Sequence, residues 1–206
     1  VVTSLRLPNV ASLSSSPVTV LTAKEIQNTN STSLAHLLSS ASGLFVKDYG
    51  SNSGLKTIAQ RGLGPEHTLV LINGMRASTP QLGLMDLGLF SADEIDRVEI
   101  LHGGNSASFG SDAVAGAVNV LTQPAMNAPT VRAFSSVGSF GYRQFQLSGG
   151  VSDESVALRG SYREEKGEED FPFVFRNGNE RFDLVRQNSD FLSRSGTLQT
   201  SLAITP

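Results

Sequence analysis

Apolar and polar residues alternate with a period of two along most of the chain after residue 130. Such alternation predicts β-strands that have one apolar and one polar face. Four strands are expected, at residues 131–137, 142–151, 155–164 and 191–205. A short connection at 138–141, a turn at 152–154 and a polar loop of 25 residues at 165–189 join them. This part of the chain is therefore predicted to be an antiparallel sheet.

The alternation leaves the environment of this sheet open. In the third strand the apolar face carries Val156, Leu158 and Tyr162, and the opposite face carries Arg159, Ser161 and Arg163. In a transmembrane β-barrel, the apolar face of such a strand would contact lipid and the polar face would line the water-filled lumen. The same pattern describes an ordinary soluble antiparallel sheet with one solvated face. Periodicity alone does not separate the two.

The residues before 124 mix helical and strand patterns. Thr22 and Glu25 form a capping box that predicts a helix at 23–28. Three leucines, Leu34, Leu37 and Leu38, share one face of a second helix expected at 32–40. Between the apolar runs 68–72 and 75–76, Asn-Gly at positions 73 and 74 predicts a type I′ hairpin.

The rest of this region is read from shorter signals. Strands are expected at 17–21, from residue 44 into a Gly/Ser/Asn loop at 49–55, at 97–101 and at 115–121. In the strand at 97–101, Val98 and Ile100 alternate with Arg97 and Glu99. Ser91 and Glu94 predict a second capping box before a one-turn helix. The domain division is then a flexible leader at 1–16, a mixed unit at 17–123, a proline-marked linker at 124–130 and the strands at 131–206.

Composition narrows the class of protein. The chain has 206 residues, 39% of them hydrophobic, a net charge of -3 and no cysteine. A core can form, no basic face indicates a nucleic-acid partner, and disulfides or thiolate metal sites are excluded. No apolar run reaches the roughly 18 residues that a membrane helix needs. The first residues lack the basic and apolar regions of a signal peptide, so we expect a mature or truncated start.

Three segments carry a family resemblance. They are PVTVLTAKEIQNTNSTSLAHLLSSASGLFVKD at 17–48, TIAQRGLGPEHTLVLINGMR at 57–76 and SADEIDRVEILHGGNSASFGSDAVAGAVNVLT at 91–122. In this order they resemble the plug domain of TonB-dependent outer-membrane receptors. The resemblance implies an α+β plug, a small mixed sheet with short helices, followed by antiparallel strands of an incomplete transmembrane β-barrel. The resemblance therefore favours a barrel wall over a soluble sheet for the C-terminal strands.

The resemblance also implies a function. The family imports scarce nutrients such as cobalamin or ferric siderophores with energy from the TonB complex, across the outer membrane of Gram-negative bacteria. The plug would face the periplasm and the barrel lumen, and the strands would meet outer-membrane lipid. Family barrels have about 22 strands, whereas this chain supplies about four. We therefore expect a fragment of a longer receptor, with no enzymatic activity of its own.

Two turns carry the residues that the resemblance assigns to plug anchoring. Arg61 and Gly62 occupy the family's Ile-Arg-Gly position, where the arginine faces carboxylates of the barrel wall. The family's second arginine turn is replaced here by His102-Gly103-Gly104, and a histidine would make a weaker contact at neutral pH. At the N-terminus, Val1, Val2 and Thr3 resemble the end of the box that adds to TonB as an edge strand.

The resemblance places the ligand at two loops, 49–55 and 76–86. The residues expected to face it are Tyr49, Ser51, Asn52, Ser53, Arg76, Ser78, Thr79, Gln81 and Asp86. Because these loops offer mainly backbone and hydroxyl groups, a neutral corrinoid suits them better than a highly anionic chelate. No cofactor is expected apart from calcium, for which Glu165, Glu168, Glu169 and Asp170 are weak candidates, since such charge runs are usually solvated.

Other functions are less consistent with the sequence. His102-Gly103-Gly104 is similar to an esterase oxyanion loop, but residues 50–54 carry Asn52 where a nucleophilic serine would stand. His36 and His67 have no metal-ligand spacing, and phosphate-binding and dinucleotide motifs are missing. The remaining alternative is a plug-like binding or signalling module of the periplasm or outer membrane that does not transport.

Overall fold

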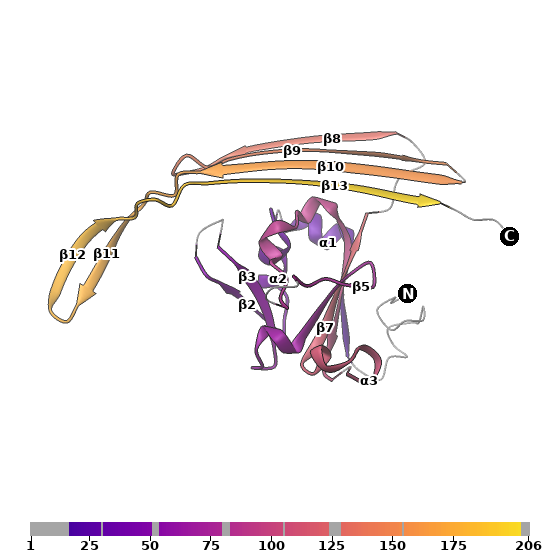
Figure 1. Ribbon diagram of the computed structural model, residues 1–206, viewed down its shortest axis with the longest axis horizontal. Helices are drawn as coiled ribbons and strands as arrows, with labels where there is room; N and C mark the ends of the chain where they lie inside the picture. Colours follow the sequence, from indigo (N-terminus) through magenta and orange to yellow (C-terminus); the bar gives the residue numbers. More distant parts are fainter. Residues whose placement is uncertain are drawn as a thin grey trace. The chain divides into compact units, whose positions relative to one another are not determined.

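The computed structural model describes residues 17–29, 31–50, 54–79, 83–104, 106–123, 129–153 and 155–202. The predicted leader and most of the predicted linker lie outside these residues. The chain forms two compact units, Val1–Pro124 and Ala125–Pro206, which are drawn in Figure 1.

A five-stranded sheet forms the centre of the first unit. Its order is β1 (Val18–Leu21), β6 (Ile95–His102), β7 (Gly116–Thr122), β4 (Thr68–Ile72) and β5 (Met75–Arg76). Strands β4 and β7 are parallel, and the other neighbours are antiparallel. A separate antiparallel pair, β2 (Leu44–Asp48) and β3 (Lys56–Gln60), flanks this sheet. The mixed sheet expected from the resemblance is therefore present.

Short helices complete the first unit. They are α1 (Ala23–Asn28), α2 (Leu34–Ser39), α3 (Ser106–Phe109) and the 3₁₀ turns η2 (Pro65–His67), η3 (Leu87–Leu89), η4 (Ala92–Glu94) and η5 (Ser111–Ala113). The capping box at α1 is formed as predicted, with both of its hydrogen bonds. Leu34, Leu37 and Leu38 are buried and belong to the main core together with the sheet.

The predicted hairpin of the first unit is confirmed, whereas two other local predictions are wrong. Asn73 and Gly74 have φ angles of 50° and 80°, as the predicted type I′ hairpin requires. Ser91, in contrast, makes no capping hydrogen bond to η4, so the second capping box is wrong. Glu99, predicted on the polar face of its strand, is fully buried because the sheet has apolar clusters on both of its faces.

A four-stranded antiparallel sheet forms most of the second unit. Its order is β13 (Phe191–Leu202), β10 (Val156–Gly167), β9 (Arg143–Ser152) and β8 (Thr130–Val137). These are the four predicted strands. The predicted loop at 165–189 is wrong in part, because it contains a hairpin of β11 (Pro172–Asn177) and β12 (Glu180–Val185). The sequence signal for this hairpin is Gly178, which turns the chain at a φ of 60°.

None of the helices among the described residues is long and apolar enough to cross a membrane.

Candidate functional site

Hydrogen bonds close the base of the loop at 49–55. The Tyr49 amide donates to the carbonyl of Leu55 at 3.1 Å. Lys56 Nζ lies 3.4 Å from Asp48 Oδ1 and donates to the carbonyl of Gly54 at 3.2 Å. Tyr49 is exposed, with Lys47 Nζ 4.5 Å from the centre of its ring. Ser51, Asn52 and Ser53 lie outside the described residues.

The loop at 76–86 is closed in a similar way. The amide and the hydroxyl of Thr79 both donate to the carbonyl of Leu84, at 2.9 and 3.0 Å, and Gly83 N donates to the Thr79 carbonyl at 2.8 Å. Arg76 forms an ion pair with Asp112 and donates to the carbonyl of Phe109. Its guanidinium is therefore engaged by η5 and α3. Gln81 lies outside the described residues.

Asp86 joins the two loops. Its Oδ1 accepts hydrogen bonds from the backbone amides of Lys56, at 3.1 Å, and of Gly88, at 2.9 Å. Lys56 follows the first loop, and Asp86 ends the second. One carboxylate thus fixes the ends of both loops against each other. The sequence places Asp86 in a loop but does not show this contact, which spans 30 positions of the chain.

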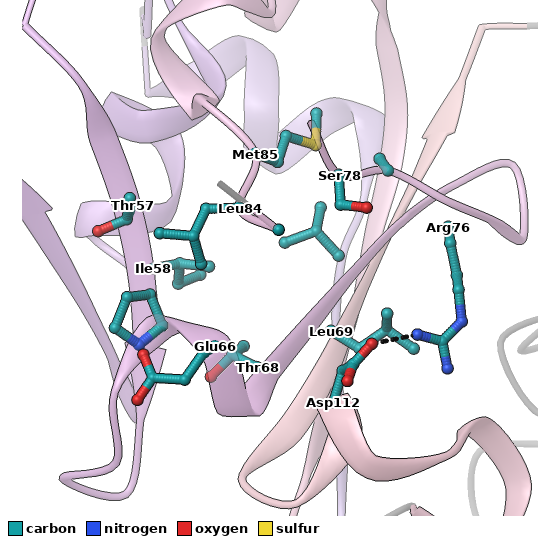
Figure 2. Close-up of a pocket in the computed structure, with 14 residues that line it drawn as sticks. Thr57, Ile58, Glu66, Thr68, Leu69, Arg76, Ser78, Leu84, Met85 and Asp112 are labelled. Carbon is teal, nitrogen blue, oxygen red and sulfur yellow. Dashed lines mark hydrogen bonds and ion pairs between the residues drawn. The ribbon is translucent and has the colours of Figure 1, made fainter. Parts of the chain in front are cut away.

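A small pocket lies beside the second loop (Figure 2). Ser78, Leu84 and Met85 line it from the loop, and Thr57 and Thr68 line it from β3 and β4. Its volume is about 40 Å³, well below the roughly 300–1,000 Å³ of pockets that hold drug-sized ligands. The hydroxyls of Thr57 and Thr68 are buried without a hydrogen-bond partner among the described residues. The pocket is therefore suited to water-sized polar molecules and is too small for a nutrient ligand.

The two predicted anchoring turns lie side by side. Arg61 and Gly62 have φ angles of 56° and 73°, and Leu63 N donates to the carbonyl of Gln60 at 3.0 Å. A Cβ placed on Gly103 would lie 3.7 Å from Arg61 Nη1. Arg61 is exposed and forms no ion pair within the part of the chain that the structure describes. Its guanidinium is available to a carboxylate from elsewhere.

His102 is held more firmly inside the first unit than Arg61. Its Nε2 lies 2.9 Å from the Thr19 hydroxyl, and its backbone amide donates to the carbonyl of Pro17 at 2.9 Å. The ring also packs on Gly43, where a Cβ would lie 3.1 Å from Cε1. One ring nitrogen of His102 thus ties the edge strand β1 to β6. Gly103 follows with a φ of 107°, which favours glycine.

The other predicted contacts receive less support. Val1, Val2 and Thr3 lie outside the described residues. Of the calcium candidates, Glu165 accepts from Tyr142 and Arg163, and Asp170 accepts from Ser189. Nowhere in the described ranges do three or more carboxylate, histidine or cysteine side chains form a group that could hold a metal ion. The structure therefore does not assemble Glu165, Glu168, Glu169 and Asp170 into a cation site.

The two faces of the four-stranded sheet differ in exposure. Its apolar side chains are exposed, among them Phe145, Leu147, Val151, Val156, Leu158, Tyr162 and Leu198. Its polar face holds the buried side chains of Gln144, Gln146, Ser148 and Arg163. Tyr142 donates to Glu165 at 2.9 Å, and burial together with this carboxylate raises the pKa of the Tyr142 hydroxyl. The arrangement reverses that of a soluble sheet.

Comparisons with known proteins agree with this architecture. Residues 11–117 match the family described as TonB-dependent Receptor Plug Domain. The vitamin B12 transporter BtuB of Vibrio cholerae is 26% identical over 152 residues, which cover 74% of this chain and 25% of that protein. BtuB of Vibrio vulnificus is 34% identical over 125 residues, 61% of this chain and 20% of that protein. The chain spans about a quarter of the length of these curated relatives.

Solved structures share the fold. The ferric yersiniabactin uptake receptor FyuA from Yersinia pestis aligns with a TM-score of 0.65 and 20% identity, over 94% of this chain and 30% of that chain. The siderophore receptor PirA from Pseudomonas aeruginosa aligns with a TM-score of 0.63 and 21% identity, over 92% and 32%. The relatives named here are a transporter and receptors, in agreement with the prediction that the chain is not an enzyme.

Proposed function

The chain belongs to the TonB-dependent receptor plug family, and from this premise we propose that it forms the plug and first wall strands of an outer-membrane nutrient importer. The first unit is the plug, and the second unit is part of the barrel wall. The importer would take up its nutrient with energy from TonB, which the N-terminal residues Val1, Val2 and Thr3 would contact as an added edge strand.

The observation that carries this proposal is the polarity of the four-stranded sheet. A soluble antiparallel sheet buries its apolar face and exposes its polar face. Here Phe145, Leu158 and Leu198 are exposed, whereas Gln144 and Gln146 are buried. A wall strand of an outer-membrane barrel has this arrangement, because its outer side meets lipid and its inner side meets a polar lumen. The exposure therefore favours the barrel over the soluble sheet.

The contacts of the first unit suggest how the plug works. The free guanidinium of Arg61, beside the turn at Gly103, would pair with carboxylates of the barrel wall and seat the plug. The loops at 49–55 and 76–86 would contact the ligand together, since Asp86 fixes one against the other. A ligand that displaces one loop would then displace the other as well. TonB would act on the seated plug from the periplasmic side and open a path.

We propose a corrinoid as the ligand. The curated relatives at 26% and 34% identity are both vitamin B12 transporters. The cations near the two loops are largely engaged, since Arg76 is paired with Asp112 and Lys56 with Asp48. Such loops offer backbone and hydroxyl groups to a ligand and little net positive charge. A highly anionic ferric chelate would find no strong cationic trap there.

Uptake by the full-length receptor tests this proposal. It would be expressed in a Gram-negative host that lacks its own cobalamin and ferric-siderophore receptors, and uptake of labelled cyanocobalamin would be measured with and without TonB. We expect TonB-dependent cobalamin uptake and no uptake of a ferric catecholate. Siderophore uptake alone would overturn the corrinoid assignment. If the receptor binds cyanocobalamin but takes up none with or without TonB, the result would instead support the non-transporting module.

A further inference from the structure

The exposed apolar face of the four-stranded sheet ends at a set of charged residues. Strand register places Leu147 opposite Tyr162, and Val151 opposite Leu158, within the apolar part of this face. Toward the end at which β10 leads into the β11–β12 hairpin, the next positions on the same face are charged. They are Glu164 opposite Arg194, and Arg143 opposite Lys166.

Arg143 and Lys166 are an unusual pair. They are direct cross-strand partners on β9 and β10, and both are exposed. Side chains directly opposite each other on an antiparallel pair lie close together, and like charges in this position are destabilising. Their outer neighbours in the same row, Val137 on β8 and Leu192 on β13, bring no negative charge. Two cations therefore face each other in this row without a carboxylate.

The nearby carboxylates relieve this repulsion only in part, since Glu164 attracts Lys166 but is also engaged by two other donors. Glu164 accepts from Arg194 Nε at 2.7 Å and from the Tyr162 hydroxyl at 2.9 Å. Glu168, just beyond β10, lies against Gly141. Neither Arg143 nor Lys166 forms an ion pair with any residue that the structure describes. The pair is therefore suited to an anion that does not come from this part of the chain.

The position of the pair indicates which anion it meets. At this end of the sheet lie the connection 138–142 and the β11–β12 hairpin, and at the other end lies the short turn after Ser152. In bacterial outer-membrane barrels short turns face the periplasm and longer connections face the outside. If the proposed function holds, Arg143 and Lys166 lie at the headgroup level of the outer leaflet, directly beyond the lipid-facing apolar band.

We propose that Arg143 and Lys166 bind a phosphate group of the glycolipid of the outer leaflet, the lipid A part of lipopolysaccharide. Basic side chains at a membrane surface attract anionic headgroups, and both guanidinium and ammonium groups form charge-assisted hydrogen bonds to phosphate oxygens. The acyl chains of the same lipid lie on the adjacent apolar face, against Phe145 and Leu147. The phosphate turns the cross-strand repulsion into attraction and holds a lipid at a fixed place on the wall.

Binding of defined lipids to the purified full-length receptor tests this inference. The variants are Arg143→Gln, Lys166→Gln and the double variant, and the control is Arg132→Gln, which removes a charge from the opposite face of β8. The probes are diphosphorylated lipid A, the same lipid without phosphate, and inorganic phosphate. We expect each substitution to weaken binding of diphosphorylated lipid A by roughly fivefold. Dephosphorylated lipid should bind the wild type and the double variant equally.

The melting temperature provides a second readout, in which the substitutions should have different effects without and with lipid A. In neutral detergent the double variant should melt at the same or a higher temperature than the wild type, because the repulsion is gone. With lipid A present, the wild type should gain stability and the double variant should not. Heat-modifiable gel migration shows that each variant is folded.

Three results would overturn the inference. They are equal lipid A binding by the wild type and the double variant, an equal loss of binding in Arg132→Gln, and displacement of lipid A by millimolar inorganic phosphate, which would indicate a free-anion site. A receptor that takes up its nutrient normally but fails these tests refutes the lipid site alone. A receptor that never reaches the outer membrane refutes the proposed function instead.

Discussion

Arg61 adopts a backbone conformation that costs a non-glycine residue free energy. Its φ of 56° lies in the left-handed region, where glycine or asparagine would be less strained. The side chain makes no ion pair among the described residues, so nothing within the first unit explains why an arginine stands in this turn. A role for the guanidinium outside the unit, in seating the plug, accounts for both observations.

Replacing Arg61 by alanine should weaken the attachment of the plug to the barrel wall without affecting the folding of the plug. In the full-length receptor the change would leave a wall carboxylate unpaired and remove a charge-assisted contact worth about 1.5–3 kcal/mol. We expect greater leakage of large antibiotics through the barrel, and smaller leakage for Arg61→Lys, which keeps the charge. Unfolding of the isolated first unit should be unchanged by either variant. Unaltered permeability in Arg61→Ala would show that Arg61 does not anchor the plug.

A second residue-scale prediction concerns the buried carboxylate of Glu99. Its Oε2 accepts from Asn119 Nδ2 at 3.3 Å, its Oε1 lies 3.2 Å from Arg97 Nε, and Asn119 Oδ1 accepts from Gly74 N at 3.0 Å. Asn119→Ala removes a partner from both Glu99 and Gly74. We expect the free energy of unfolding of the first unit to fall by about 1–3 kcal/mol in urea denaturation.

The exposed Gln27→Ala is the matched control for this substitution, with an expected change within about 0.5 kcal/mol. Equal effects of the two variants would contradict a structural role for the Glu99–Asn119 contact.

At the scale of elements, most features that depend only on neighbouring residues can be predicted from the sequence, and the β11–β12 hairpin is the exception. The capping box of α1 and the Asn73–Gly74 hairpin involve residues at most a few positions apart, and both are formed. The capping box expected at Ser91 is wrong because Ser91 bridges to Ser33 and makes no side-chain hydrogen bond to the one-turn helix that follows it. The β11–β12 hairpin was missed because charged residues dominate its surroundings.

The contacts between distant parts of the chain explain the rest of the differences. Asp86 reaches Lys56 across 30 positions, and the buried state of Glu99 depends on strands and clusters on both faces of the sheet. Local patterns carry no information about either. The family resemblance supplied the two loops and the anchoring turns, but their mutual contacts could be found only in the structure.

The capping box gives a pH prediction for α1. Hydrogen bonds from the backbone amide and hydroxyl of Thr22 hold the pKa of Glu25 below its ordinary value of 4.5. A lowered pKa in the folded state means that the stabilisation is complete above pH 4.5 and is lost as the pH falls through the folded value. The stability difference between wild type and Glu25→Gln should therefore be constant at neutral pH and shrink below pH 4.5. A difference that grows on acidification would contradict this assignment.

At the scale of the whole molecule, the two units should differ in their ability to fold alone. The first unit has two apolar clusters, a five-stranded sheet and capped helices of its own. We therefore expect residues 17–123 to fold as a soluble unit with a well-dispersed amide NMR spectrum. A collapsed spectrum would argue that the plug requires the wall.

The second unit should not form a stable membrane structure alone. Within the residues that the structure describes, its sheet ends at β8 and β13, and neither outer edge is paired with another strand. In hydrocarbon each unsatisfied backbone group costs several kcal/mol, so that only a closed barrel is tolerated. In water the exposed face of Leu158, Leu198 and Leu202 adds an apolar patch to these edges. We expect residues 131–206 to aggregate or to form a loose, protease-sensitive sheet.

Reconstitution of the 206-residue chain in lipid vesicles decides this point. The readouts are protease protection and heat-modifiable gel migration, with the full-length receptor as the positive control. The full-length receptor should be protected because a barrel of about 22 strands pairs every edge. The 206-residue chain should be digested after residue 130 and should show no heat-modifiable band. If it inserts as a compact, protected species, several copies must close a barrel together. The wall-fragment interpretation would then give way to that of an oligomeric module.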